Sequence, residues 1–174
     1  IVAGRIPVFI EPSMAFGTGT HETTQLCMEA LERYLAPGAT CLDIGTGSGI
    51  LAMAAAKLGA RKIVACDIDP IAVEIAASNG AQNGCATKAR WILGDVEKTR
   101  PFQPACLVAN LTVELIEEEF WKLERRLKSG AFMILSGLLN SQAKRIERLR
   151  RQSSLRLRRR LSKGEWTCLV YVRP

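Results

Sequence analysis

A glycine-rich turn constrains the fold of this chain more than any other feature: residues 43–50 read Asp-Ile-Gly-Thr-Gly-Ser-Gly-Ile. The turn follows an apolar run over residues 39–44 and leads into a segment of helical period, so it joins a buried strand to a helix. Glycines at such a junction let the backbone approach a ligand closely. A second apolar run, residues 62–66, ends at Asp67, about 20 residues further on, where a carboxylate can accept hydrogen bonds from ribose hydroxyls. The combination predicts a site for a nucleotide-type cofactor.

The spacing of the glycines discriminates between cofactors. A dinucleotide fingerprint has the form Gly-x-Gly-x-x-Gly, and the place of its third glycine is taken here by Ile50. That glycine normally allows helix and strand to pack closely beside a pyrophosphate. The form found here, Gly-x-Gly-x-Gly with a downstream acid, suits S-adenosylmethionine, which has a ribose but no phosphate. An NAD-dependent dehydrogenase is therefore disfavoured.

Apolar runs alternate with segments of helical period along the rest of the chain, which is typical of βαβ units and a parallel sheet. The expected crossover strands are 40–44, 62–66, 89–93, 106–109 and 131–136. The expected helices are 20–35, 49–58, 70–83, 113–127 and 141–152. Two short strands, 155–161 and 166–172, close the chain as an antiparallel hairpin. We therefore expect an α/β fold: a doubly wound, Rossmann-like sheet of seven strands, mostly parallel, with a C-terminal antiparallel hairpin.

Length and composition fit a single globular domain over residues 1–174, in which residues 1–19 form an N-terminal segment and a loop that covers the cofactor. No apolar stretch approaches the roughly 20 residues of a membrane span, so no membrane association is expected. The six cysteines form no Cys-x-x-Cys pair and several lie in apolar runs, which predicts buried thiols in a reducing cytoplasm. With a single histidine, no metal site is expected.

The segment 12–24, ahead of the first strand, combines two glycines, four threonines, a phenylalanine and the only histidine. A loop of this composition can cover a ligand and then lead into a helix, for which Thr20 is a suitable N-cap. An ordinary capped start of a helix is the simpler alternative. His21 could act as a general base, although a lone histidine is more often a hydrogen-bonded structural group.

Further polar residues fall at the carboxyl ends of expected strands, where doubly wound sheets bind their ligands. Asp95 follows the third strand and can accept from an adenine amino group, while the Val96 N–H can meet a ring nitrogen; alone, Asp95 is equally a turn residue. Asn110 ends the fourth strand, where its amide can orient the cofactor or an incoming amine, or simply close the strand. Gly137 is expected to give the fifth strand a sharp exit, and Trp166 to anchor the core or surface.

Positive charge is concentrated near the C-terminus of a chain whose formal net charge is +7. The residues concerned are Lys144, Arg145, Arg148, Arg150, Arg151, Arg156, Arg158, Arg159, Arg160 and Lys163. This region is expected to contact RNA or a ribonucleoprotein. The alternative is a solvated helix face next to a charged edge strand that resists aggregation, and no aromatic residue is interleaved here to stack on bases.

Taken together, these segments resemble the PrmA family, the methyltransferases of ribosomal protein L11. The resemblance covers essentially the whole chain, and Phe-Gly-Thr-Gly-Thr-His at residues 16–21 is far more specific than the glycine turn. The other matching segments are residues 43–50, Asp67-Ile68-Asp69-Pro70, Val108-Ala109-Asn110 and Leu135-Ser136-Gly137.

The resemblance implies a class I methyltransferase sheet that uses S-adenosylmethionine to methylate lysine side chains and the amino terminus of a ribosomal protein, often to the trimethyl state. It places cofactor contacts on Thr24, Gly45, Asp67 and Asn110, with Asn110 also as the catalytic residue that positions the reacting groups. It implies that the neighbours of the cofactor are Phe16, Gly17, Gly47, Ile68 and Asp95.

The chain departs from the family in two respects. The family normally carries a separate amino-terminal domain that grips the protein substrate, and we expect that domain to be absent from this chain. After Asn110 the family usually continues Ile-Leu-Ala-Gly-Pro, whereas residues 111–115 here are Leu-Thr-Val-Glu-Leu, on the acceptor side of the site. The alternatives are a methyltransferase of the same fold that acts on another protein, an RNA or a small-molecule amine, and a non-catalytic cofactor-binding module.

Overall fold

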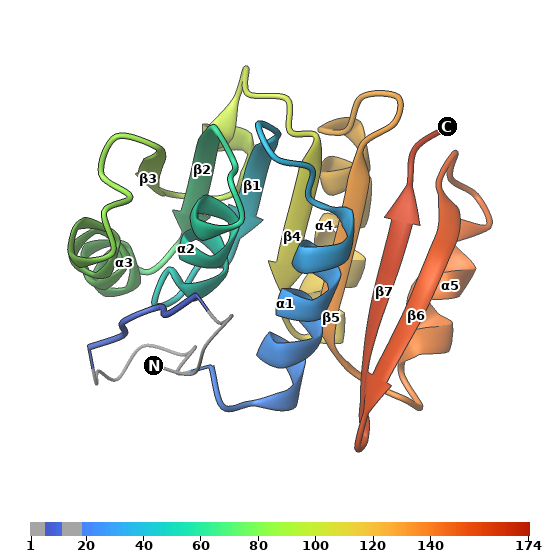
Figure 1. The fold of residues 1–174 in the computed structure, drawn as a ribbon. Helices are drawn as coiled ribbons and strands as arrows, with labels where there is room; N and C mark the ends of the chain where they lie inside the picture. The colour runs from blue at the N-terminus through green and yellow to red at the C-terminus, as the bar shows by residue number, and fades with distance from the viewer. Residues whose placement is uncertain (1–5, 12–18) are drawn as a thin grey trace.

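A mixed sheet of seven strands runs through the computed structural model, which describes residues 6–11 and 19–174 (Figure 1). The strands lie in the order β3-β2-β1-β4-β5-β7-β6, with β1 to β5 parallel and β7 antiparallel to both of its neighbours. Their bounds are β1 Thr40–Ile44, β2 Lys62–Asp67, β3 Ala89–Leu93, β4 Cys106–Asn110, β5 Phe132–Leu139, β6 Arg156–Lys163 and β7 Trp166–Val172. This confirms the predicted doubly wound sheet and its C-terminal hairpin.

Helices cover both faces of the sheet, as Figure 1 shows. Their bounds are α1 Glu22–Tyr34, α2 Ile50–Lys57, α3 Pro70–Gln82, α4 Val113–Arg125 and α5 Ala143–Arg150, with a short 3-10 helix, η1, at Val96–Thr99 that was not expected. The helices α1 and α2 share one apolar cluster with the sheet, while α4 and α5 share the cluster on the opposite face. None of the described helices is long and apolar enough to cross a membrane.

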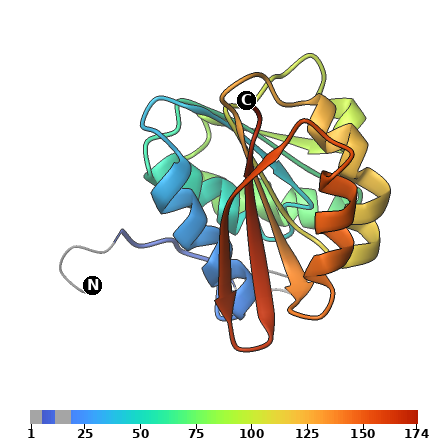
Figure 2. The same cartoon turned by 90° about the vertical axis from the view of Figure 1, so that its right-hand side faces the viewer.

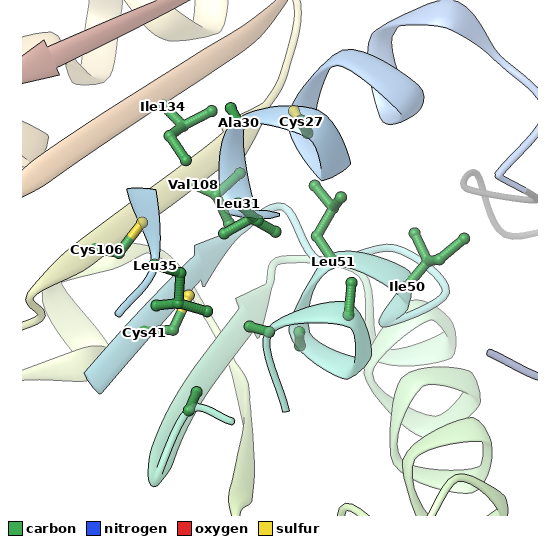
Figure 3. Close-up of a cluster of buried hydrophobic side chains, with 14 of the residues drawn as sticks. Cys27, Ala30, Leu31, Leu35, Cys41, Ile50, Leu51, Cys106, Val108 and Ile134 are labelled. Atoms are coloured by element: carbon green, nitrogen blue, oxygen red, sulfur yellow. The ribbon is translucent and has the colours of Figure 1, made fainter. Parts of the chain in front are cut away.

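The six cysteines are all buried, as predicted, and they contribute to the two apolar clusters. Figure 3 shows Cys27 of α1 near Ala30, Leu31 and Val108 in one of them. Burial raises the pKa of the Cys66 thiol to about 12, so this sulfur stays protonated at neutral pH. The cysteines therefore serve as small apolar side chains in the core.

The first helix, α1, begins at Glu22, one residue later than it would with Thr20 as its N-cap. Its N-cap is His21, whose Nδ1 accepts from the backbone N–H of Thr23, so the prediction that Thr20 caps this helix is wrong. Thr20 and His21 both have a side-chain acceptor. The backbone at His21 is extended, with φ −72° and ψ 141°, as an N-cap requires. The carbonyl of Thr20 instead accepts from the side-chain amide of Gln25.

The fifth strand continues beyond its expected end, and Gly137 does not turn the chain out of the sheet. The pairing of β5 with β7 is interrupted after Leu135 and resumes at Leu138, so Gly137 lies in an irregularity inside the strand. Its φ is +88°, and a Cβ placed there would lie 2.1 Å from the carbonyl oxygen of Leu111. Glycine is therefore required because another backbone segment approaches closely.

Candidate functional site

A cavity of about 680 Å³ opens at the carboxyl ends of the parallel strands, where the sheet order reverses between β1 and β4. Its walls come from the ends of β1, β2 and β4 and from the starts of α1, α4 and β7. Six of the expected site residues line it together: Gly45, Gly47, Asp67, Ile68, Asp95 and Asn110. Segments far apart in the sequence therefore share one pocket.

The glycine turn forms the floor of this cavity. The backbone N–H groups of Gly45 and Thr46 donate to the carbonyl of Cys66, at 2.9 and 3.0 Å, which ties the turn to the end of β2. Gly45 has φ +68°, and a Cβ there would lie 2.4 Å from a side-chain methyl group of Leu111. Glycine is therefore required here because the Leu111 side chain packs directly against the turn.

Asp67 links the turn to the second strand and faces the cavity. Its Oδ2 accepts from the N–H of Gly47 at 2.9 Å, and its Oδ1 accepts from the N–H of Asp69 at 3.1 Å. Each carboxylate oxygen can accept more than one hydrogen bond, so both remain able to bind ribose hydroxyls. The two backbone donors hold the carboxylate in one orientation before any ligand arrives.

Asp43 supports the turn from below and is fully buried. Its Oδ2 accepts from the hydroxyl of Thr46 at 2.7 Å and from the N–H of Ala52 at 3.1 Å, so one carboxylate joins the turn to α2. Burial raises the pKa of Asp43 to about 7, because desolvation outweighs these two hydrogen bonds. Its Oδ1 has no partner in the described part of the chain.

Asn79 is a second support that the sequence did not point out. It lies in α3, is fully buried, and its Nδ2 donates to the carbonyl of Ser48 in the glycine turn at 2.9 Å. Its Oδ1 accepts from the N–H of Glu11, in the described segment 6–11. One amide therefore joins the turn to the chain that approaches it, and a polar residue on the buried side of an apolar helix was the available signal.

The far wall of the cavity carries Ile68 and Asp95. Ile68 lines the cavity and is 74% exposed, which leaves a large apolar surface available to a planar ring. The Oδ1 of Asp95 accepts from the N–H groups of Glu97 and Lys98 and caps η1. Its other oxygen takes no part in that cap and can accept from an amino group.

A network of polar side chains forms the opposite wall. The Nδ2 of Asn110 donates to the hydroxyl oxygens of Thr23 and Thr24, at 3.2 and 3.4 Å, and Thr23 Oγ1 lies 2.8 Å from His21 Nδ1. The hydroxyl of Ser136 donates to the carbonyl of Thr23 at 3.1 Å. The first turn of α1, the end of β4 and the middle of β5 are thereby held together, and the orientation of the Asn110 amide is set.

Of the three other expected site residues, only Thr24 lies in the part of the chain that the structure describes. Thr24 is 1% exposed and lies behind Asn110, to which it is hydrogen-bonded, rather than in the cavity wall. Phe16 and Gly17 lie outside the described residues.

Two residues that the sequence favoured as structural line the cavity. The rings of His21 and Trp166 meet edge to face, with centroids 4.9 Å apart, and both belong to the cavity wall. Trp166 begins β7, more than fifty positions after Asn110. No local sequence signal connects the two, because β7 comes beside the site only when the C-terminal hairpin pairs with β5.

Comparisons with known proteins agree with this arrangement. A family model described as "Ribosomal protein L11 methyltransferase (PrmA)" matches residues 2–174. A ribosomal protein L11 methyltransferase of Geobacter metallireducens is 42% identical over 169 residues, which are 97% of this chain and 55% of the relative. The corresponding Thermus thermophilus protein is also 42% identical, over 97% of this chain and 66% of its own length. The chain thus spans little more than half the length of most of these curated relatives.

Solved structures give the same answer for the fold. The structure described as ribosomal protein L11 methylase from Lactobacillus delbrueckii subsp. bulgaricus superposes with a TM-score of 0.87 at 32% identity, over 98% of this chain and 90% of that one. An RNA methyltransferase from Salinibacter ruber, solved with S-adenosyl-L-homocysteine, has a TM-score of 0.70 at 18% identity, over 86% of this chain and 91% of that one. At that identity the second likeness concerns the fold alone.

Proposed function

The chain belongs to the ribosomal protein L11 methyltransferase (PrmA) family, and we propose that it transfers methyl groups from S-adenosylmethionine to amines of an L11-type ribosomal protein. The observation that carries the proposal is the convergence of the glycine turn, Asp67 and Asn110 on one cavity at the switch point of the sheet. The choice of a ribosomal protein as acceptor rests on the names of the relatives, and the choice of cofactor rests on the residues that line the cavity.

The residues present fit S-adenosylmethionine. Asp67 would hold the ribose hydroxyls, Ile68 would cover one face of the adenine, and Asp95 would accept from its amino group. The absence of a side chain at Gly45 lets Leu111 pack directly against the turn, and both residues line the cavity. When bound there, S-adenosylmethionine supplies a methyl group on a sulfonium, which is already a strong electrophile.

Asn110 is the residue best placed to orient the incoming amine. Its Nδ2 is engaged by two threonine hydroxyls, so its carbonyl oxygen is left to accept from an N–H of the acceptor. Thr23 and His21 act on Asn110 as positioning residues, since they fix its amide through one chain of hydrogen bonds. Holding the amine in line contributes more here than acid–base groups would, because the methyl donor needs no activation.

The amine must be neutral to attack, and the cavity favours that form. Apolar side chains, among them Ile44, Leu111 and Leu115, line much of the pocket and reduce its water content. An ammonium group that enters loses hydration, which lowers its pKa and releases the proton to solvent. No side chain needs to remove that proton within the described part of the site.

A ribosomal acceptor implies a cytoplasmic site of action and brings RNA close to the enzyme. The RNA or ribonucleoprotein contact expected from the basic C-terminal region is therefore part of the same proposal.

The test is transfer of labelled methyl from S-adenosylmethionine to three separate acceptors: free ribosomal protein L11, unmodified ribosomes, and ribosomal RNA. We expect label on lysine or amino-terminal nitrogens of L11. Asn110→Ala should abolish most of the transfer while S-adenosylhomocysteine still binds, because the change removes the group that orients the acceptor.

Label on RNA or on another protein instead would reassign the substrate and leave the cofactor site in place. Cofactor binding with no transfer to any acceptor would favour a non-catalytic module and count against the proposal.

A further inference from the structure

The net positive charge of the molecule is concentrated in one region. Residues 144–163 contain ten of the chain's 24 Lys and Arg residues and only one of its 17 Asp and Glu residues, so the rest of the chain is slightly acidic. In the structure this region comprises α5 and the edge strand β6 with their connection, which lie side by side at one end of the sheet in Figures 1 and 2. The charge thus forms a surface of its own, here called the α5–β6 surface.

Most of these cations are not neutralised by the protein itself. Arg145 forms ion pairs with Glu114 and Glu117, and Arg160 forms one with Glu147, in which Nη1 and Oε1 are 3.5 Å apart. The other eight make no ion pair with the part of the chain that the structure describes: Lys144, Arg148, Arg150, Arg151, Arg156, Arg158, Arg159 and Lys163. The surface therefore carries a large surplus of charge that repels itself unless an anion is bound.

The geometry of β6 spreads its arginines in several directions. Every residue of the strand is exposed except Leu161, and within residues 6–11 and 19–174 no strand pairs with its outer side. The pairing of β6 with β7 shifts register after Leu157, so that Arg159 pairs with Val170 and Arg160 pairs with Leu169. Val170 and Leu169 belong to the apolar clusters on opposite faces of the sheet. The strand therefore presents guanidinium groups on both faces along one edge.

The charge continues from β6 onto α5. A depression of about 340 Å³ on the helix is lined by Lys144, Arg148 and Arg151, together with Glu147. Protection of a sheet edge from aggregation requires only a few charges on the edge strand, commonly lysines, and does not explain a basic helix next to it. Six of the eight unpaired cations are arginines, whose planar guanidinium binds phosphate with two parallel hydrogen bonds.

From these observations we propose that the α5–β6 surface binds the phosphate backbone of structured RNA. No aromatic residue occurs in residues 144–163, so single-stranded bases have nothing to stack on and the contact is with phosphates. The turn that joins β6 to β7 leads directly into Trp166, which lines the cavity, so the surface begins beside the catalytic site. The inference rests on the proposed function to the extent that an RNA held there would present a neighbouring ribosomal protein to the cavity.

The test measures binding of a fluorescently labelled RNA hairpin by anisotropy over a series of salt concentrations. The variant that removes Arg156, Arg158 and Arg159 by substitution with Gln is compared with a control of equal charge, Arg61→Gln, Lys88→Gln and Lys128→Gln, whose residues are exposed elsewhere. We expect the first variant to raise Kd at least about tenfold and to lower the slope of log K against log salt by about 2–3, and the control to change neither by half as much.

Equal losses in the two variants would show that only total charge matters and would overturn the proposal. Competition by polyglutamate as effective as that by unlabelled RNA would also overturn it, since the partner would then be an acidic protein. Methyl transfer to free ribosomal protein L11 should be the same in both variants and in the parent. A failure of that reaction with RNA binding intact would count against the proposed function and not against this surface.

Discussion

The two walls of the cavity are built in different ways. The wall at β1 and β2 consists of one short turn, supported by Asp43 and Asp67, whose contacts are mostly to backbone N–H groups. The wall at β4 and β5 consists of side chains from several distant segments, joined through Thr23 and Asn110. A turn supported by its own backbone can be recognised in a sequence, whereas a wall assembled from separate elements depends on how those elements pack.

Leu111 joins the two walls, because its side chain faces Gly45 and its backbone faces Gly137. Gly137→Ala should therefore cost about 4 kcal/mol or more of unfolding free energy, since the new Cβ meets a backbone carbonyl that cannot move independently. Gly45→Ala meets a flexible side chain and should cost less. Urea denaturation measures both, with Gly130→Ala as the control, since Gly130 has a φ of +78° and open space around it. Similar losses for Gly137→Ala and Gly130→Ala would show that only the dihedral angle matters.

Burial of Asp43 should make the stability of the turn depend on pH. A folded-state pKa raised to about 7 means that the protonated carboxyl is favoured in the folded protein. The contribution is fully present below the unfolded pKa near 4 and is lost as pH rises through about 7, with an upper limit of about 4 kcal/mol. The measurement is unfolding free energy at pH 4 to 8 for the parent and Asp43→Asn, which cannot ionise. Parallel pH profiles for the two proteins would contradict the prediction.

Asp67→Ala tests whether the wall at β1 and β2 binds the ligand. Loss of a charge-assisted hydrogen bond to ribose, worth about 1.5–3 kcal/mol, should weaken binding of S-adenosylhomocysteine by one to two orders of magnitude. Isothermal titration calorimetry measures it. Asp69→Ala is the control, because Asp69 caps α3 by accepting from Ile71 N–H and does not line the cavity. Unchanged affinity in Asp67→Ala would remove Asp67 from the site.

Thr23→Val tests the wall at β4 and β5 and is expected to have the smallest effect of these substitutions. It keeps the shape of the side chain but removes the hydroxyl that connects His21 and Asn110. We expect kcat to fall about tenfold, as loss of one or two hydrogen bonds implies, with KM for S-adenosylmethionine nearly unchanged. The control is Thr40→Val, at the amino end of β1, where the hydroxyl accepts from the N–H of Ala105. An equal effect on KM and none on kcat would assign Thr23 to cofactor binding instead.

Much of the fold was predictable because it rests on local periodicity. The crossover strands and the five helices lie within a few residues of their expected bounds, since burial selects apolar runs and helical faces directly. Two local predictions failed where neighbouring residues compete or distant segments meet. His21 and not Thr20 caps the first helix, and β5 continues past Gly137 because β7 pairs with it on the far side.

The sequence by itself determined the class of fold, the glycine turn and the acid that follows it, because each depends on a short stretch of chain whose residue types allow few conformations. Only the tertiary structure decided that Trp166 and His21 share a wall with Asn110, and that Thr24 lies behind that residue. The same holds for Asn79, which joins the turn to the segment at 6–11. These contacts join residues whose separation along the chain carries no signal, and those around Asn110 form only when the sheet order brings β4, β5 and β7 together.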